Sequence, residues 1–156
     1  MKYLTLILSV IIFSCSNTKN STSTTEAITF KSIQKNSNSG FEELTTEVIT
    51  SQSELEKTWK QAWSRFSDAP EIPKIDFTQK QVILVALGMK NNGGFGLEIE
   101  NITQTKNEIS VNYIEIRPDA NCINSQAIVF PFELIEIEKT AKKVVFKSTE
   151  KIIDCK

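Results

Sequence analysis

The sequence contains no histidine among its 156 residues. A Ser-His-Asp triad or a Cys-His nucleophile pair therefore cannot be assembled, and neither can a metal site that depends on imidazole ligands. Catalysis by carboxylates or lysines alone stays open in principle, but the chain shows no recognisable constellation of that kind. We expect a protein that is not an enzyme and that uses no metal or cofactor.

An excess of positive charge is also missing, since 18 Lys and Arg stand against 19 Asp and Glu. Proteins that bind nucleic acid usually show a basic excess or a basic stripe, so no nucleic-acid partner is expected. Beyond the N-terminal region the longest apolar run, Val82 to Leu87, is far too short to span a bilayer. Hydrophobic residues make up 40% of the chain, which is enough for the core of one ordinary domain.

The N-terminal region has the pattern of a secretory signal. Lys2 precedes an almost unbroken apolar run from Leu4 to Phe13, which is too short for a spanning helix. The run stops at Ile12-Phe13-Ser14-Cys15-Ser16, which resembles the lipobox of bacterial lipoproteins, with Phe13 bulkier than usual. The alternative is an ordinary signal peptide in which the cysteine is incidental.

The lipobox resemblance implies that residues 1–14 are removed and that Cys15 becomes the lipidated N-terminus, carrying chains such as palmitate. Each buried methylene contributes about 0.8 kcal/mol to membrane binding, so several chains together anchor stably. Residues 15–27 are interpreted as the lipidated cysteine and a flexible tether, because Ser16–Glu26 contains no apolar residue. Ser16 after the cysteine, in place of aspartate, favours the outer membrane of the cell envelope.

Residues 28–156 are expected to form one α+β domain, a mainly antiparallel sheet with one packed amphipathic helix. Ser51 stands three residues before Glu54, the spacing of a capping box at a helix start. One apolar stripe of that helix is expected to face the core, with Trp63 at its edge. The stripe consists of Leu55, Trp59, Ala62 and Phe66.

Strands are indicated on both sides of this helix by β-branched residues and by alternating patterns. The continuous run from Val82 to Leu87 is typical of a central strand covered on both faces. Pro131 interrupts a long candidate over 128–137, because proline cannot donate to a ladder. The other candidate strands are 28–33, 43–50, 97–102, 109–113 and 144–147.

A glycine-rich segment, Gly88 to Gly96, joins the central strand to the next one. Asn-Gly and Gly-Gly pairs supply the positive φ angles of a tight hairpin, so local chemistry alone predicts a simple turn. A P-loop is not indicated, because the lysine and the following helix are missing.

The wider pattern resembles the C-terminal domain of the PrcB family, named for an accessory subunit of a bacterial surface protease complex. The resemblance covers about residues 75–140 and departs at Asn92, where threonine is usual, and at Phe95, where tyrosine is common. The matching pieces are Asp76-Phe77, Val82 to Gly88, Gly93-Gly94-Phe95, Leu97 to Ile102, Arg117-Pro118 and Gln126 to Phe132.

The resemblance implies a non-catalytic protein that binds or stabilises a protein partner in the cell envelope, such as a protease. The loop Asn92, Gly93, Gly94, Phe95 and Gly96 is the predicted contact, because glycines leave backbone groups unobstructed. Inhibition of an envelope protease is one alternative function. Binding of a small ligand or carbohydrate is another, and it requires an apolar pocket.

Two further cysteines, Cys122 and Cys155, would follow the lipidated one into an oxidising compartment, where we expect them to form a disulfide. Closing the loop between them is worth about 3–4 kcal/mol in the chain-entropy model. Their distance in sequence and the lack of a Cys-x-x-Cys motif speak against a redox role.

Charged residues on the candidate strands are interpreted as surface residues. Strand alternation places the glutamates on the solvated face, and no calcium loop is present. Arg117 is expected to form a surface ion pair. The glutamates concerned are Glu98, Glu100, Glu133, Glu136 and Glu138.

Overall fold

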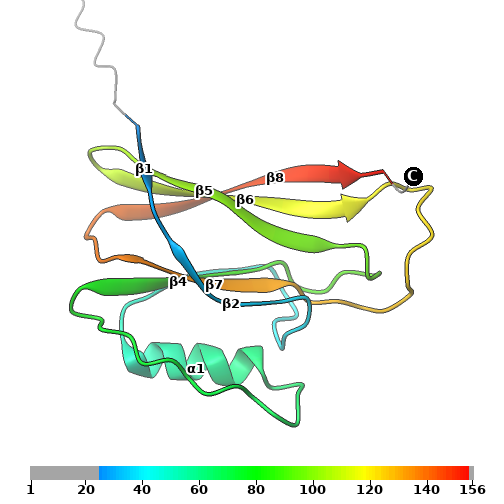
Figure 1. Cartoon of the computed structure of the whole chain (residues 1–156), viewed down its shortest axis with the longest axis horizontal. Coiled ribbons are helices and arrows are strands. Elements are labelled where there is room, and N and C mark those ends of the chain that lie inside the picture. The colour runs from blue at the N-terminus through cyan, green and yellow to red at the C-terminus, as the bar shows by residue number, and fades with distance from the viewer. Residues whose placement is uncertain (1–24, 155–156) are drawn as a thin grey trace, which may run out of the picture.

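The computed structural model describes residues 25–154 and consists of two stacked four-stranded sheets with one helix (Figure 1). The first sheet has the order β1 (Glu26–Ile28), β5 (Gly96–Gln104), β6 (Glu108–Pro118) and β8 (Lys143–Ile153). The second has the order β2 (Lys31–Asn36), β7 (Phe132–Glu138), β4 (Lys80–Ala86) and β3 (Thr45–Ile49). Helix α1 (Gln52–Ala62) covers the outer face of the second sheet. All strand pairs are antiparallel except β6 with β8, so the predicted α+β class is confirmed.

Strand β4 is the centre of the core and is buried on both faces, as the sequence predicts. Val82, Leu84 and Ala86 pack in the cluster beneath α1, whereas Ile83 and Val85 pack between the two sheets. Full burial of one such aliphatic side chain is worth about 1.5–3 kcal/mol. The two-sided burial of β4 therefore ties the helix layer to the sandwich.

Helix α1 begins after the N-cap that the sequence predicts. The Ser51 hydroxyl accepts from the Glu54 backbone N–H at 3.3 Å, which satisfies one of the unpaired amides of the first turn. The Glu54 carboxylate accepts from the backbone N–H of Thr50 at 2.8 Å, one residue before the cap. The motif thus differs from a standard capping box in one bond, because the glutamate accepts from the residue before the N-cap and not from the N-cap itself.

The buried stripe of α1 is shorter than predicted. Leu55, Trp59 and Ala62 are buried as expected, and Trp63 at the C-cap is buried as well. The helix ends at Ala62, so Phe66 lies beyond it and remains 38% exposed. Its assignment to the buried stripe was wrong, because the helical period does not continue past residue 62.

The cap of α1 should make stability depend on acid pH. Hydrogen bonding, first of all from the Thr50 backbone, lowers the pKa of Glu54 below its ordinary value of 4.5. Because this pKa is lower in the folded state than in the unfolded state, the ionised carboxylate stabilises the fold at pH values above the unfolded pKa. This contribution is lost as the pH falls through the folded pKa. Glu54→Gln should therefore flatten the acid side of the stability curve in urea unfolding measured from pH 7 to pH 3. An unchanged acid slope would contradict this role.

Several strand boundaries differ from the sequence prediction. The predicted strand 28–33 is two strands, β1 and β2, because the chain crosses between the sheets at residues 29–30. The candidate over 128–137 is strand only from Phe132, since the chain before Pro131 contributes a single isolated bridge. The last strand extends to Ile153 because it follows β6 in parallel over its whole length.

The predicted N-terminal segments lie mostly outside the described residues. The signal peptide 1–14 and Cys15 fall there. Glu26 and Ala27, predicted to belong to the tether, form part of β1 instead. Within residues 25–154 no helix is long and apolar enough to cross a membrane.

The sandwich has two chemically different ends. Glu26 pairs with Gln104 beside the β5–β6 turn, so the chain enters at this end, which we call the turn end. We call the opposite end the loop end, and the C-terminal residue of β8 lies there (Figure 1). The loop end is built from residues 37–44, 87–95 and 119–131.

Candidate functional site

The predicted contact loop, residues 92–96, lies at the loop end and is not a hairpin. Strands β4 and β5 belong to different sheets, so the segment between them carries the chain from one sheet to the other. Among the described residues only Gly88 has a positive φ, 72°. The prediction of a tight hairpin with positive φ at the Gly-Gly pair is therefore wrong.

The Gly-Gly pair serves close packing. The Gly93 N–H donates to the Ser125 carbonyl at 3.0 Å, and the Gly94 N–H donates to Asn92 Oδ1 at 2.9 Å. A Cβ atom on Gly94 would lie 2.7 Å from Asn124 Oδ1 and 2.9 Å from Pro118 Cγ. The loop is thus braced against residues 118–125, and two of its amides are already used inside the molecule. Its role as a partner contact stays a prediction.

Phe95 is half-buried, and Gly96 opens strand β5. The Lys90 ammonium lies 5.7 Å from the centroid of the Phe95 ring and 2.7 Å from a Glu115 carboxylate oxygen. Lys90 also exchanges backbone hydrogen bonds with Val129 at 2.8 and 3.0 Å. These contacts fix the start of the loop and leave only part of the aromatic ring accessible.

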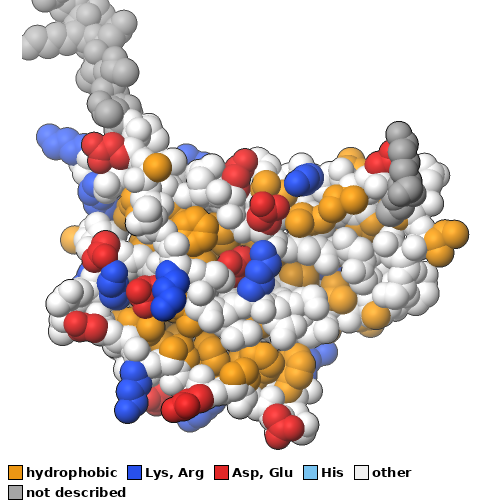
Figure 2. All heavy atoms as spheres, in the orientation of Figure 1, with side chains coloured by type: hydrophobic (Ala, Val, Ile, Leu, Met, Phe, Trp, Pro, Cys, Tyr) orange, Lys and Arg blue, Asp and Glu red, His pale blue; other side chains and the backbone are white. Residues whose placement is uncertain are grey.

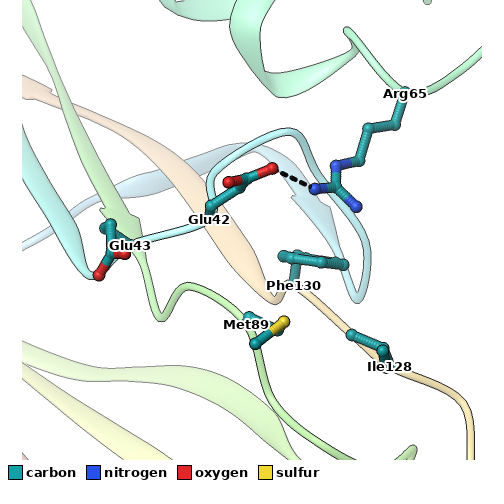
Figure 3. Close-up of a pocket in the computed structure, with 6 residues that line it drawn as sticks. All are labelled: Glu42, Glu43, Arg65, Met89, Ile128 and Phe130. Carbon is teal, nitrogen blue, oxygen red and sulfur yellow. Dashed lines mark hydrogen bonds and ion pairs between the residues drawn. The ribbon is translucent and has the colours of Figure 1, made fainter.

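Beside this loop the surface is hollowed into a groove that the sequence did not indicate (Figure 3). Two adjoining hollows of about 430 and 270 Å³ share Arg65, Ile128 and Phe130, and we call the pair the Arg65 groove. The larger hollow is also lined by Glu42, Glu43 and Met89, and the smaller one by Asn38, Ser39 and Phe66.

Arg65 is held in place on both of its sides. Its guanidinium lies 4.1 Å from the centroid of the Phe130 ring and 2.6 Å from a carboxylate oxygen of Glu42 (Figure 3). The Phe130 backbone is fixed in turn by Ser39, whose hydroxyl donates to its carbonyl at 2.9 Å. A cation on an aromatic face contributes about 0.5–1 kcal/mol at an exposed site. The floor and one wall of the groove are therefore preformed.

Every exposed large apolar side chain of the described residues lies in the loop-end segments, at the adjoining end of β8 or, for Phe66, in the Arg65 groove. Met89 is 61% exposed and Ile128 is 55% exposed, and both line the Arg65 groove. In the view of Figure 2 most charged side chains lie toward the turn end, whereas the loop end carries few charges. The full set is Leu44, Phe66, Met89, Ile123, Ile128, Ile152 and Ile153.

Sequence reasoning missed this cluster because its members lie far apart in the chain. Met89 and Ile128 adjoin β-rich runs and resemble ordinary strand residues. A weak signal was available, since Met89 and Phe95 are the two apolar residues of a segment that otherwise consists of polar residues and glycines.

The predicted surface charges are only partly where we expected them. Arg117 forms a surface ion pair with Glu150 at 2.9 Å, as predicted. Glu133, in contrast, is buried, accepts from the Ser32 hydroxyl at 2.8 Å and pairs with Lys35 at 3.3 Å. Its placement on a solvated face was wrong, because β7 lies inside its sheet and is covered on both faces. Glu98, Glu100 and Glu138 are exposed, and Glu136 is partly so.

The predicted disulfide cannot be traced to both of its ends, because Cys155 lies outside the described residues. The sulfur of Cys122 lies 3.5 Å from the carbonyl oxygen of Ile153, to which the Asp119 N–H donates at 3.0 Å. The end of β8 is therefore held beside Cys122, as the pairing requires. The bridge stays a prediction, and intact mass after alkylation with and without reductant tests it.

The comparisons with known proteins give one family. Residues 81–138 match the family model described as PrcB C-terminal. No curated protein and no solved structure matches this chain. The matched segment runs from β4 to β7 and includes Met89, Ile128 and Phe130 of the Arg65 groove as well as the loop 92–96. The segment from β4 to β7 is thus similar to the PrcB C-terminal family.

Proposed function

We propose that this chain is a non-catalytic lipoprotein of the cell envelope that binds a protein partner belonging to a protease complex. The family match is compatible with a protein associated with such a complex. The observation that supports binding most directly is the gathering of exposed apolar side chains at the loop end. Apolar surface of this kind, bordered by polar residues, is typical of interaction sites.

The groove has properties of a recognition surface. Met89 and Ile128 are more than half exposed, whereas Phe130 between them is buried and only 6% exposed. The arrangement offers apolar surface to a partner around a fixed floor, and a preformed surface loses less conformational entropy on binding. No reaction is assigned to it, because the chain has no histidine and the groove holds only Glu42, Glu43 and Arg65 as ionisable groups.

Photo-crosslinking in the source bacterium tests this proposal. Benzoylphenylalanine placed at Met89 or at Ile128 should give the same covalent adduct, identified by mass spectrometry as a protease or a subunit bound to one. The same probe at Glu56, an exposed position of α1, is the matched control and should not give this adduct. Equal labelling from Glu56, or no adduct from either groove position, would refute partner binding at the loop end.

The inhibitor alternative makes a different prediction in the same experiment. An inhibitor would crosslink to residues of the active-site cleft of the protease, and adding the purified chain would abolish proteolysis. An accessory subunit should label a surface outside the cleft and leave the protease active.

Anchoring through Cys15 is part of the proposal. Wild-type chain should incorporate labelled palmitate and partition into the detergent phase of Triton X-114, whereas Cys15→Ser should do neither. Several acyl chains give stable anchoring and one gives only marginal anchoring, so partitioning should be nearly complete in the wild type. A Cys15→Ser chain that still incorporates palmitate would contradict this assignment.

A further inference from the structure

The charges of the Arg65 groove are not balanced. Three ionisable side chains line the larger hollow, two glutamates and one arginine. The arginine is already engaged, since its guanidinium pairs with Glu42 and stacks on Phe130. Within residues 25–154 no lysine or arginine forms an ion pair with the exposed Glu43. The groove therefore presents one uncompensated negative charge beside apolar surface.

The acidic side of the groove is held rigidly against its apolar side. The Met89 N–H donates to the Glu42 carbonyl at 3.0 Å, which ties residues 42–43 to the segment after β4. Leu44, directly after Glu43, is 62% exposed. Figure 3 shows Glu43 and Arg65 on opposite sides of the hollow, with Glu42 and Phe130 between them and Met89 and Ile128 below. A ligand that fills the groove meets an apolar floor with a free carboxylate at one edge.

We infer that the groove binds an extended segment of a partner protein in which a lysine or arginine stands next to large apolar side chains. This inference rests on the proposed function and names the chemistry of the partner. The cationic side chain pairs with Glu43, and the apolar side chains cover Met89, Ile128 and Leu44. Complementary charge at the edge of an apolar contact selects the partner and sets its register.

Two other occupants fit the same observations less well. A second copy of this chain, docked groove to groove, would oppose two surfaces that each carry two glutamates and one arginine, and net charges of the same sign repel. A bilayer of anionic lipids would likewise be repelled by the carboxylates at the groove edge. A cationic protein segment meets neither cost.

Peptide binding to the full-length chain, purified in detergent, tests the inference. Three fluorescein-labelled peptides of eleven residues are compared. Their central residues are Leu-Lys-Phe, Leu-Glu-Phe or Ser-Lys-Ser, and all other residues are Gly or Ser. Fluorescence polarisation measures their binding. Leu-Lys-Phe should bind most tightly, and Glu43→Lys should weaken it about fivefold or more, because one exposed ion pair is lost and a repulsion is added. Glu43→Gln should give an intermediate loss. Glu56→Lys on α1 is the matched control and should change nothing.

The outcomes separate this inference from the proposed function. Equal affinity for Leu-Lys-Phe and Leu-Glu-Phe, or no effect of Glu43→Lys, would overturn the cationic partner. The crosslinks from Met89 would then still decide whether a protein binds at all. Dimers in sedimentation that Met89→Glu abolishes would show that a second copy occupies the groove, and flotation with vesicles of anionic lipid that Met89→Glu abolishes would show a bilayer. Either result would also overturn the inference.

Discussion

Gly88→Ala should lower the free energy of unfolding by about 2–4 kcal/mol, because strain and a backbone clash add at this position. Gly88 has a φ of 72°, a conformation that residues with a side chain adopt only with strain. A Cβ atom here would lie 2.8 Å from the Glu42 carbonyl oxygen and 2.9 Å from the Leu44 nitrogen. These are backbone atoms, so a side-chain rotation cannot relieve the contact.

The matched control is Gly96→Ala, at the other end of the same connection. A Cβ atom there meets Ile116 at 3.6 Å, which is ordinary van der Waals contact. Gly96 also begins strand β5, where a residue with a side chain restricts the unfolded chain and costs nothing in the fold. Urea denaturation of both variants should therefore show a large loss for Gly88→Ala and a change of about 0.5 kcal/mol or less for Gly96→Ala. Equal losses would contradict the argument from backbone geometry.

The Gly88 substitution has a second expected effect on the groove. The clash falls on residues 42–44, which include Glu42 and Glu43 of its acidic side. Gly88→Ala chain that remains folded at low temperature should bind the Leu-Lys-Phe peptide more weakly than wild type. Gly96→Ala should bind it as wild type does.

Leu84→Ala should cost about 2–5 kcal/mol of unfolding free energy, which is the range for leucine truncation in packed cores. Leu84 lies at the middle of β4, is 0% exposed and packs in the cluster beneath α1. Its neighbours come from the helix and from β7, so the cavity borders two rigid elements that cannot both collapse into it. A domain of this size has about 5–15 kcal/mol in total, so the variant should unfold at a clearly lower urea concentration.

Leu44→Ala removes the same atoms from a surface position and serves as the control. Leu44 is 62% exposed, so its truncation leaves no cavity and should change stability by about 0.5 kcal/mol or less. The two variants thus separate burial from side-chain chemistry. A similar loss for both would mean that β4 is not the packed centre of the molecule.

The sequence predicts those parts of the fold in which local pattern and tertiary environment agree. The run from Val82 to Leu87 predicts a central strand, because a strand without polar positions must be covered on both faces. The Ser51 cap is equally local, since cap and partner lie three residues apart. Both predictions are confirmed.

The predictions that fail depend on which strands become neighbours. Glu133 alternates with apolar residues and therefore resembles a surface position, yet β7 is an interior strand and both of its faces are covered. The Gly-Gly pair resembles a hairpin because sequence alone does not reveal that β4 and β5 belong to different sheets. The Arg65 groove joins segments around residues 42, 65, 89 and 128, and no local pattern brings these together.

The position of β1 has a consequence for where the groove would work. The chain enters the sandwich at the turn end, and the nine residues of β5 separate this entry from the loop end by about 26 Å at about 3.3 Å per step. If Cys15 is acylated as proposed, the ten residues 16–25 add at most about 35 Å between the lipidated cysteine and the start of β1. The groove, at the far end of the sandwich from this attachment, could then lie up to about 60 Å from the lipid. A partner confined to the same membrane meets it at a raised effective concentration, so a contact that is weak in solution suffices.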